Sequence, residues 1–325
     1  MRTVVTGGAG FIGSHLTEYL LAAGDEVVVL DNMSTGNPDN LERARSSSGL
    51  TIIDGSVLDR ETVDEAIGGA DRVFHLAAAV GVRLIVDEPL AGLRTNIHGT
   101  ENVLDACLAH GAHLLLASTS EIYGKNASDR LHEDSDRVLG DPLLSRWSYA
   151  AAKGIDEAFA HAYWREFGLS VAIVRLFNTV GPRQTGRYGM VVPNLVGQAI
   201  ANAPLTVFGD GKQTRCFSFV GDVVPAMVRI AEHPDAVGRA FNLGGATEIS
   251  IADLARRIIE ITESSSEIEY IRYEDAYPAG FEDMRRRVPD NSRSKALIGF
   301  EPRTGVDDII KYVAADLAWR YAMGK

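Results

Sequence analysis

Short apolar runs alternate with amphipathic stretches from the first residues of the chain onward. Residues 3–6 form a β-branched run that predicts a buried strand, and a helical pattern follows from about 11 to 23 and stops at Gly24. Residues 27–30 predict a second buried strand, with Asp31 at its carboxyl end. The chain therefore opens with a strand–helix–strand unit.

The same alternation continues along the first half of the chain. Further strands are predicted at 50–53, 71–76, 114–117 and 171–176, and further helices at about 41–44, 61–67, 89–110 and 148–167. Repeated alternation of strand and helix is typical of an α/β fold, a Rossmann-type doubly wound parallel sheet covered on both faces. Ligands of such sheets bind in the crevice at the carboxyl ends of the strands.

After residue 176 the pattern loosens. Residues 184–214 indicate a loop, a helix near 193–201 and a turn, whereas 217–220, 223–231 and 240–243 indicate a return to the sheet. A helix at 251–262, a strand at 267–273 and a closing helix follow. Because no Pro/Gly/Ser-rich linker separates the two parts, we expect a smaller, interleaved domain. The predicted boundaries are 1–176 plus 215–245 for the larger domain and 177–214 plus 246–325 for the smaller, substrate-binding one.

Glycines at 7, 10 and 13 lie between the first strand and the first helix. They permit a tight turn, a bare backbone against a pyrophosphate and close packing of helix on strand. The helix N-terminus adds free N–H groups and a partial positive charge for that anion. Asp31 would accept hydrogen bonds from the adenosine ribose hydroxyls and repel a 2′-phosphate, so the sequence predicts NAD rather than NADP.

The composition and charge of the chain exclude several classes of binding partner. The 325 residues are 46% hydrophobic and 23% charged, as in an ordinary globular enzyme. A net charge of −12 without a long Lys/Arg block argues against nucleic acid or an anionic membrane as the main partner. Cys107 and Cys216 fit neither a disulfide framework nor a metal site, and no signal peptide or apolar run of ~18 residues is found. We therefore expect a metal-free cytoplasmic protein.

Tyr149 and Lys153 lie four residues apart near a helix start, so they share one face. A phenol has a pKa near ~10, but an ammonium ~4 Å away at an effective dielectric of ~20 would favour the phenolate by ~4 kcal/mol. That effect would bring the pKa of Tyr149 near ~7, where a general base is most useful. Thr119, at the end of the fifth strand, could share the hydroxyl proton. His75, at the end of the fourth strand, is expected to be a structural histidine rather than a catalytic one.

With these residues in place the chain resembles the extended short-chain dehydrogenase/reductase family, the NAD-dependent nucleotide-sugar epimerases and dehydratases. The resemblance covers essentially the whole chain. It rests on Gly-Gly-Ala-Gly-Phe-Ile-Gly at 7–13, His-Leu-Ala-Ala at 75–78, Ser-Thr-Ser-Glu-Ile-Tyr-Gly at 118–124, Tyr-x-x-x-Lys at 149–153, Arg-Leu-Phe-Asn-Thr at 175–179 and Gln-Thr-Arg-Cys-Phe at 213–217.

The resemblance implies an enzyme with a tightly held NAD that is reduced and reoxidised within one turnover. It implies that Tyr149 takes the proton of the sugar 4-hydroxyl while the C4 hydride passes to the nicotinamide. It further implies a UDP-sugar substrate whose diphosphate is held by Asn178 and Arg215 with help from the arginines at 285–287, and a homodimer formed through the helices at 89–110 and 148–167. Arginine's forked guanidinium suits a diphosphate, which an acidic protein must hold with local cations.

The residue at position 121, here Glu121, helps to distinguish the reactions that members of this family catalyse. Pure C4 epimerases of the family usually carry a small residue there, whereas sugar dehydratases and UDP-glucuronate decarboxylases carry Glu. The Thr-Asp-Glu of dTDP-glucose dehydratases supplies a leaving-group acid that Ser120 lacks, and GDP-mannose dehydratases mostly use NADP, which Asp31 disfavours. In a uronic acid, a C4 ketone makes the C6 carboxylate a β-keto acid, so CO₂ departs without an acid. The segments 213–215 and 287–290 also resemble the decarboxylase pattern, although Val288 replaces the usual Lys.

The leading hypothesis is therefore a UDP-glucuronate decarboxylase. A UDP-glucuronate or UDP-hexose 4-epimerase becomes the better reading if Glu121 is only a turn residue, and a sugar-nucleotide 4,6-dehydratase is the third. A non-catalytic NAD-sensing module is disfavoured because Thr119, Tyr149 and Lys153 are all retained.

The predicted site residues fall into three groups. The catalytic residues are Thr119, Glu121, Tyr149 and Lys153. The residues predicted to bind the cofactor are Gly7, Gly10, Phe11, Ile12, Gly13, Asp31, Asn32, Ser56, Val57, Leu76, Ala77, Ala78, Asn96, Ser118, Tyr149 and Lys153. Those predicted to bind substrate are Ser120, Asn178, Val192, Arg215 and Arg287.

Overall fold

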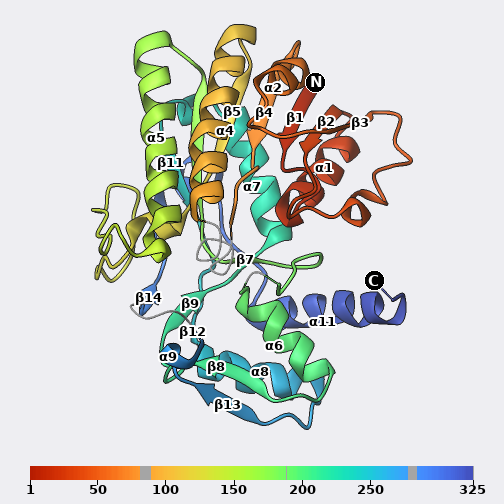
Figure 1. Cartoon of the computed structure of the whole chain (residues 1–325), viewed down its shortest axis with the longest axis vertical. Coiled ribbons are helices and arrows are strands. Elements are labelled where there is room, and N and C mark those ends of the chain that lie inside the picture. Colours follow the sequence, from red (N-terminus) through yellow and green to blue (C-terminus); the bar gives the residue numbers. More distant parts are fainter. Residues whose placement is uncertain (81–88, 188, 277–283, 325) are drawn as a thin grey trace.

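A parallel β-sheet forms the centre of the larger part of the fold (Figure 1). The structure, a computed structural model, describes residues 1–80, 89–187, 189–276 and 284–324. Within these residues the sheet has seven strands in the order β11-β6-β5-β4-β1-β2-β3, all parallel. They are β1 (Arg2–Thr6), β2 (Glu26–Asp31), β3 (Leu50–Asp54), β4 (Arg72–His75), β5 (His113–Thr119), β6 (Val171–Leu176) and β11 (Ala240–Leu243). The strand order reverses between β1 and β4, which is where doubly wound sheets bind ligands.

Helices cover both faces of this sheet, as the alternating sequence pattern predicts. They are α1 (Phe11–Ala22), α2 (Arg60–Ile67), α4 (Pro89–His110), α5 (Ser148–Phe167), α7 (Val220–Glu232) and α10 (Ser292–Ile298). Successive strand residues point to opposite faces, so Val5 packs in the core beneath α1 and α7, while Val4 packs in the core beneath α2, α4 and α5. The Rossmann-type α/β architecture is thereby confirmed.

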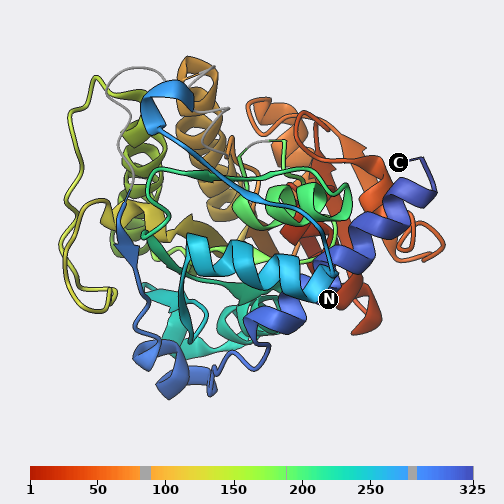
Figure 2. The ribbon, with the colours of Figure 1, turned by 90° about the horizontal axis from the view of Figure 1, so that it is seen from below.

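A second, smaller core lies in the carboxyl-terminal part of the chain. It is formed by α6 (Val191–Ile200), β8 (Leu205–Phe208), α8 (Ile251–Thr262), β13 (Ile268–Ile271) and α11 (Val306–Ala322), and α9 (Tyr273–Ala276) follows β13. β8 and β13 pair in parallel, and α6, α8 and α11 pack on one another. Seen from below, α8 and α11 lie in front of the sheet (Figure 2).

Two short ladders lie between the large sheet and this second core. β7 (Thr179–Val180) pairs with β10 (Ser218–Phe219), and β9 (Thr214–Cys216) lies between β12 (Glu248–Ser250) and β14 (Arg286–Arg287). In the second ladder Arg215 is the register partner of Arg287. The ladder thus brings together two arginines that are far apart in the sequence.

The structure corrects the sequence analysis in the second half of the chain. The predicted bounds of α4, α5 and β6 are confirmed, and 240–243 joins the main sheet as β11. The prediction that 217–220 returns to the main sheet is wrong, because β10 pairs with β7 instead. β8 was missed because its partner β13 lies far along the chain, and the short helix expected at 41–44 is instead a 3-10 turn at Pro38–Leu41.

The two cysteines, Cys107 and Cys216, are buried free thiols. In the part of the chain that the structure describes, no helix combines the length and apolar character needed to cross a bilayer.

Candidate active site

The glycine-rich turn between β1 and α1 leaves room only for backbone. A Cβ atom on Gly13 would lie 2.1 Å from the Gly7 carbonyl oxygen, and one on Gly7 would lie 2.8 Å from the Ala77 amide nitrogen. Gly7 also has a φ of 71°, in the left-handed region that favours glycine. Gly10 is the N-cap of α1 and offers no side chain to its first-turn N–H groups, which include those of 11–13. The turn therefore fits the pyrophosphate of a dinucleotide.

Asp31 ends β2 beside this turn, and backbone groups orient its carboxylate. Its Oδ2 accepts the N–H of Ala9 at 2.9 Å and its Oδ1 accepts the N–H of Met33 at 2.9 Å. Burial raises the pKa of Asp31, and the two backbone donors lower it. Since a carboxylate has about four acceptor positions, acceptors are left for ribose hydroxyls. Asn32 is exposed and accepts the N–H of Ser34 at 3.1 Å.

The loop at 76–78 lies against the glycine-rich turn. The N–H of Ala77 donates to Thr6 Oγ1 at 3.2 Å. Asn96 of α4 holds the next residue, Ala79, because its Oδ1 accepts the Ala79 N–H at 2.8 Å and its Nδ2 donates to the Ala79 carbonyl at 3.3 Å. The buried Asn96 amide thus orients this loop, and its direct contact with a cofactor stays a prediction.

The other predicted cofactor residues lie at or just beyond strand ends. Ser56 and Val57 follow β3, and Val57 packs so closely on α4 that a Cβ atom on Gly99 would lie 2.6 Å from it. Ser118, in β5, donates to Glu157 Oε1 of α5 at 2.5 Å. The Ser118 hydroxyl therefore links β5 to α5 through this hydrogen bond.

Tyr149 and Lys153 lie on the buried face of α5, near the carboxyl end of β5. The Tyr149 hydroxyl hydrogen-bonds with the Thr119 side chain. Lys153 Nζ lies 2.8 Å from Asp156 Oδ2, and both side chains are almost completely buried. The structure therefore brings Thr119 and Tyr149 together as predicted, but it gives the Lys153 ammonium a carboxylate partner that the sequence analysis did not anticipate.

The prediction that Lys153 brings the pKa of Tyr149 to about 7 is wrong for this structure. Burial raises the pKa of Tyr149 above its ordinary value, and the carboxylates of Glu121 and Asp156 raise it further. The hydrogen bond to Thr119 lowers it, but not enough to reverse the direction. Because burial and the two carboxylates disfavour the phenolate, Tyr149 is a neutral phenol in this structure.

Glu121 is held between two arginines. It lies in the 3-10 turn η2 (Ser120–Tyr123) just after β5. Arg146 Nη1 donates to its Oε2 at 2.6 Å, and Arg287 Nη1 donates to its Oε1. Arg287 Nη2 also donates to Asn178 Oδ1 at 2.5 Å. Together, these contacts join three segments that are far apart in the sequence. Burial by itself would raise the pKa of Glu121, but Arg146 and Arg287 lower it to about 2.

The remaining predicted substrate residues have different surroundings. Ser120 is buried at the start of η2, and Arg215 is buried in β9 beside Arg287. Asn178 donates its amide to the Cys216 carbonyl at 3.0 Å. Val192 lies in the hydrophobic core of the carboxyl-terminal part, which leaves only its backbone for a ligand.

Two buried charged residues of this site, Arg146 and Asp156, were not predicted from the sequence. Asp156 follows Tyr149 by seven residues and Lys153 by three, so helical periodicity could have placed it on the same face. Arg146 lies in the 3-10 turn η3 (Ser145–Trp147), where helical spacing gives no such signal. Of the arginines at 285–287, Arg286 pairs with Glu248 at 2.8 Å and is partly exposed.

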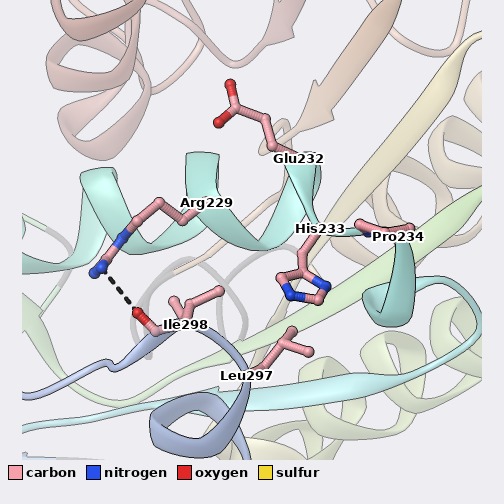
Figure 3. A pocket seen from close by; sticks show the side chains of 6 residues that line it. All are labelled: Arg229, Glu232, His233, Pro234, Leu297 and Ile298. Atoms are coloured by element: carbon pink, nitrogen blue, oxygen red, sulfur yellow. Dashed lines mark hydrogen bonds between the residues drawn. The ribbon is translucent and has the colours of Figure 1, made fainter.

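A surface hollow lies at the end of the sheet opposite to the site around Tyr149. It is lined by Arg229, Glu232, His233, Pro234, Leu297 and Ile298 (Figure 3). Arg229 Nη1 donates to the Ile298 carbonyl at 2.8 Å across it, and Glu232 pairs with Arg72 at the start of β4. The hollow is therefore at the amino ends of the strands, away from Tyr149.

A doubly wound sheet with a dinucleotide turn, an acid at the end of β2 and a Thr–Tyr–Lys group beside β5 defines a class: a dinucleotide-dependent α/β enzyme. The model of the NAD dependent epimerase/dehydratase family matches residues 3–244. The chain belongs to this family, is an enzyme, and uses NAD as its cofactor.

Individual relatives agree with this assignment. The chain is 39% identical over 311 residues to a UDP-N-acetyl-alpha-D-glucosaminuronate decarboxylase of Bacillus cytotoxicus, covering 95% of each. It is 36% identical to UDP-glucuronic acid decarboxylase 1 of Arabidopsis thaliana, covering 97% of this chain and 69% of the relative. The UDP-glucuronic acid 4-epimerase of Bacillus cereus, solved with UDP-glucuronic acid and NAD, is 28% identical with a TM-score of 0.89, covering 99% of this chain and 100% of that one.

Proposed function

We propose that this enzyme is a UDP-uronate decarboxylase that acts on UDP-glucuronate. The observation that carries the proposal is the convergence of two buried arginines, Arg146 and Arg287, on the single carboxylate of Glu121. Through Glu121, both guanidinium groups stand next to the part of the site where Tyr149 lies. A uronate differs from a neutral hexose by a C6 carboxylate, and a guanidinium binds a carboxylate through paired hydrogen bonds, so arginines at this position favour the anionic sugar.

The chain's own residues fit the acid–base steps of this reaction. Once ionised, Tyr149 Oη accepts the proton of the sugar 4-hydroxyl, and the Thr119 hydroxyl holds the Tyr149 side chain in position. Bound NAD supplies the oxidising and then the reducing equivalent. A ketone at C4 places the C6 carboxylate β to a carbonyl, so CO₂ leaves without an acid at position 120, where the chain has Ser120. Two of the relatives named above are decarboxylases of UDP-uronates, which supports the same reading.

A UDP-uronate 4-epimerase is the second candidate. Thr119, Tyr149 and Lys153 would serve that reaction equally well, and the Bacillus cereus epimerase has the same overall fold. A 4,6-dehydratase is less well supported, because loss of water needs an acid where this chain carries Ser120.

Product mass separates these reactions. Purified protein with NAD is given UDP-glucuronate, UDP-N-acetylglucosaminuronate or UDP-glucose, and the products are followed by mass spectrometry and NMR. We expect loss of CO₂ from a UDP-uronate. Unchanged mass with an inverted C4 would establish the epimerase instead, and loss of water would establish the dehydratase.

Adjacent arginines provide a matched pair of variants. Arg287→Met removes one of the two charges on Glu121 and should lower kcat/KM for the uronate by about 100-fold, or about 3 kcal/mol. Arg286→Met removes a neighbouring charge that pairs with Glu248 and should change kcat/KM by less than about threefold. Equal losses in both variants would refute the role given to the arginine pair.

We also propose that the enzyme is a cytoplasmic homodimer formed through α4 and α5. Leu90, Ile155 and Phe167 on these helices are exposed apolar side chains, and contact between copies would cover them. Light scattering should give twice the chain mass, and Ile155→Asp should shift it to the monomer. A monomeric wild type would contradict the dimer.

A further inference from the structure

Three polar side chains follow one another along the buried face of α5. Tyr149, Lys153 and Asp156 are spaced i, i+4 and i+7, which stacks them on one side of the helix. Lys153 is 2% exposed and Asp156 is fully buried, with 2.8 Å between Lys153 Nζ and Asp156 Oδ2. A carboxylate is rarely buried to this extent unless it is paired, so this ion pair is a built feature of the site.

A series of buried polar contacts connects this pair to the glycine-rich turn. Thr6, the last residue of β1, lies 2.7 Å from His75 Nδ1 and accepts the Ala77 N–H. His75 Nε2 lies 3.1 Å from Thr100 Oγ1. Thr100, on α4, lies beside the Asp156 carboxyl. Burial raises the pKa of Asp156, and Lys153 and the Thr100 side chain offset part of that rise. The contacts therefore run from the cofactor turn, through β4 and α4, to the residue that pairs with Lys153.

The chemistry of the groups gives this series an expected direction. A Thr100 hydroxyl turned toward an ionised Asp156 would donate to it, which leaves Thr100 Oγ1 to accept from His75 Nε2–H. Burial, together with the charge of Lys153, lowers the pKa of His75 to about 3, so the imidazole is neutral. Its Nδ1 then carries no proton and accepts from the Thr6 hydroxyl. The expectation that His75 is structural agrees with these contacts.

We propose that Asp156 is a positioning residue that holds the Lys153 ammonium on the Tyr149 face of α5 and sets the pH at which Tyr149 accepts a proton. The proposal rests on the proposed C4 oxidation only for its kinetic test. Among the described residues, the charged or titratable groups facing Tyr149 and this pair include Lys153, Asp156 and Glu157 of α5, Glu121 of η2, Arg287 of β14 and His75 of β4. Among them, Asp156 is the carboxylate in direct contact with Lys153.

The first test is the pH profile of turnover in Asp156→Asn, measured with NAD and UDP-glucuronate. Asn keeps the shape of the side chain and removes its negative charge, so Tyr149 should lose its proton at lower pH. We expect the acid limb of the plot of kcat against pH to move about one pH unit lower. At a given pH on that limb, the rate should then be about tenfold higher than in the wild type. A limb that stays within about 0.2 units, or moves up, overturns the proposal.

Asp25→Asn is the matched control. Asp25 is also a largely buried aspartate in an ion pair, with Arg72 at 2.6 Å, but it lies at the amino end of the sheet. Both variants should lose stability, whereas only Asp156→Asn should move the acid limb. Equal shifts in the two variants would assign the effect to loss of stability and overturn the proposal.

The second test needs neither a variant nor turnover. The ring nitrogens of His75 in the wild-type protein are followed by ¹⁵N NMR between pH 5 and 9. We expect a neutral ring protonated on Nε2 throughout this range. An Nδ1-protonated ring, or titration near the ordinary pKa of ~6.5, overturns the series of contacts. If no UDP-uronate is turned over, the proposed function fails, while this measurement still tests the contacts between Thr6, His75 and Thr100.

Discussion

The Glu121–arginine cluster makes a quantitative prediction about stability. In Glu121→Gln the side chain resembles the protonated acid, so the variant loses what ionisation of Glu121 contributes to folding. The pKa of Glu121 is about 2 in the folded protein, against an ordinary value of 4.5 for a glutamate side chain. At about 1.36 kcal/mol per pKa unit, this difference corresponds to about 3 kcal/mol of stability at pH 7.

The sign of the pH dependence follows from the lowered pKa. An acid whose pKa is lower in the folded state stabilises the protein above its unfolded-state pKa, and that stabilisation is lost as the pH falls toward the folded-state value. The contribution of Glu121 should therefore be complete above about pH 5.5 and fall to about 1.4 kcal/mol at pH 3. The difference between wild type and Glu121→Gln should shrink by the same amount.

Urea unfolding of wild type and Glu121→Gln at pH 7, 4 and 3 measures this difference directly. Glu166→Gln, at an exposed position near the end of α5, is the control and should stay within about 0.5 kcal/mol of wild type. A difference below about 1 kcal/mol at pH 7, or one that does not depend on pH, would refute the conclusion that Arg146 and Arg287 hold Glu121 ionised.

Other substitutions test the remaining parts of the site. Tyr149→Phe should abolish turnover of every UDP-sugar while NAD still binds in a fluorescence titration; measurable turnover would remove Tyr149 as the base. Gly13→Ala should weaken NAD binding by more than about 100-fold, because its Cβ atom would meet the Gly7 carbonyl at 2.1 Å, whereas Gly305→Ala, with open space around its Cβ, should bind normally. Asp31→Asn should reduce the preference for NAD over NADP by at least about tenfold in measured Kd values, and an unchanged ratio would contradict the role of this carboxylate.

The order of strands and helices up to residue 176 was predictable because each element carries a local signal. The apolar period identifies the strands, and the glycine spacing at 7, 10 and 13 identifies the dinucleotide turn. The second half was less predictable because its short strands are defined by their partners. β9 pairs with β12 and β14, and β8 pairs with β13, so no local pattern identifies β8, β9, β12 or β14, although the alternation at 267–273 did predict β13.

The sequence by itself determined the fold class, the NAD turn and the identities of Thr119, Tyr149 and Lys153, because local spacing and residue chemistry suffice for these. Only the tertiary structure decided which charges meet. Arg146 and Arg287 reach Glu121 from distant segments, and Asp156 pairs with Lys153. Burial, together with the carboxylates of Glu121 and Asp156, keeps Tyr149 a neutral phenol where spacing alone predicted a lowered pKa. The physical reason is that the proton affinity of a buried group depends on every charge that folding brings beside it, and on the water that folding removes.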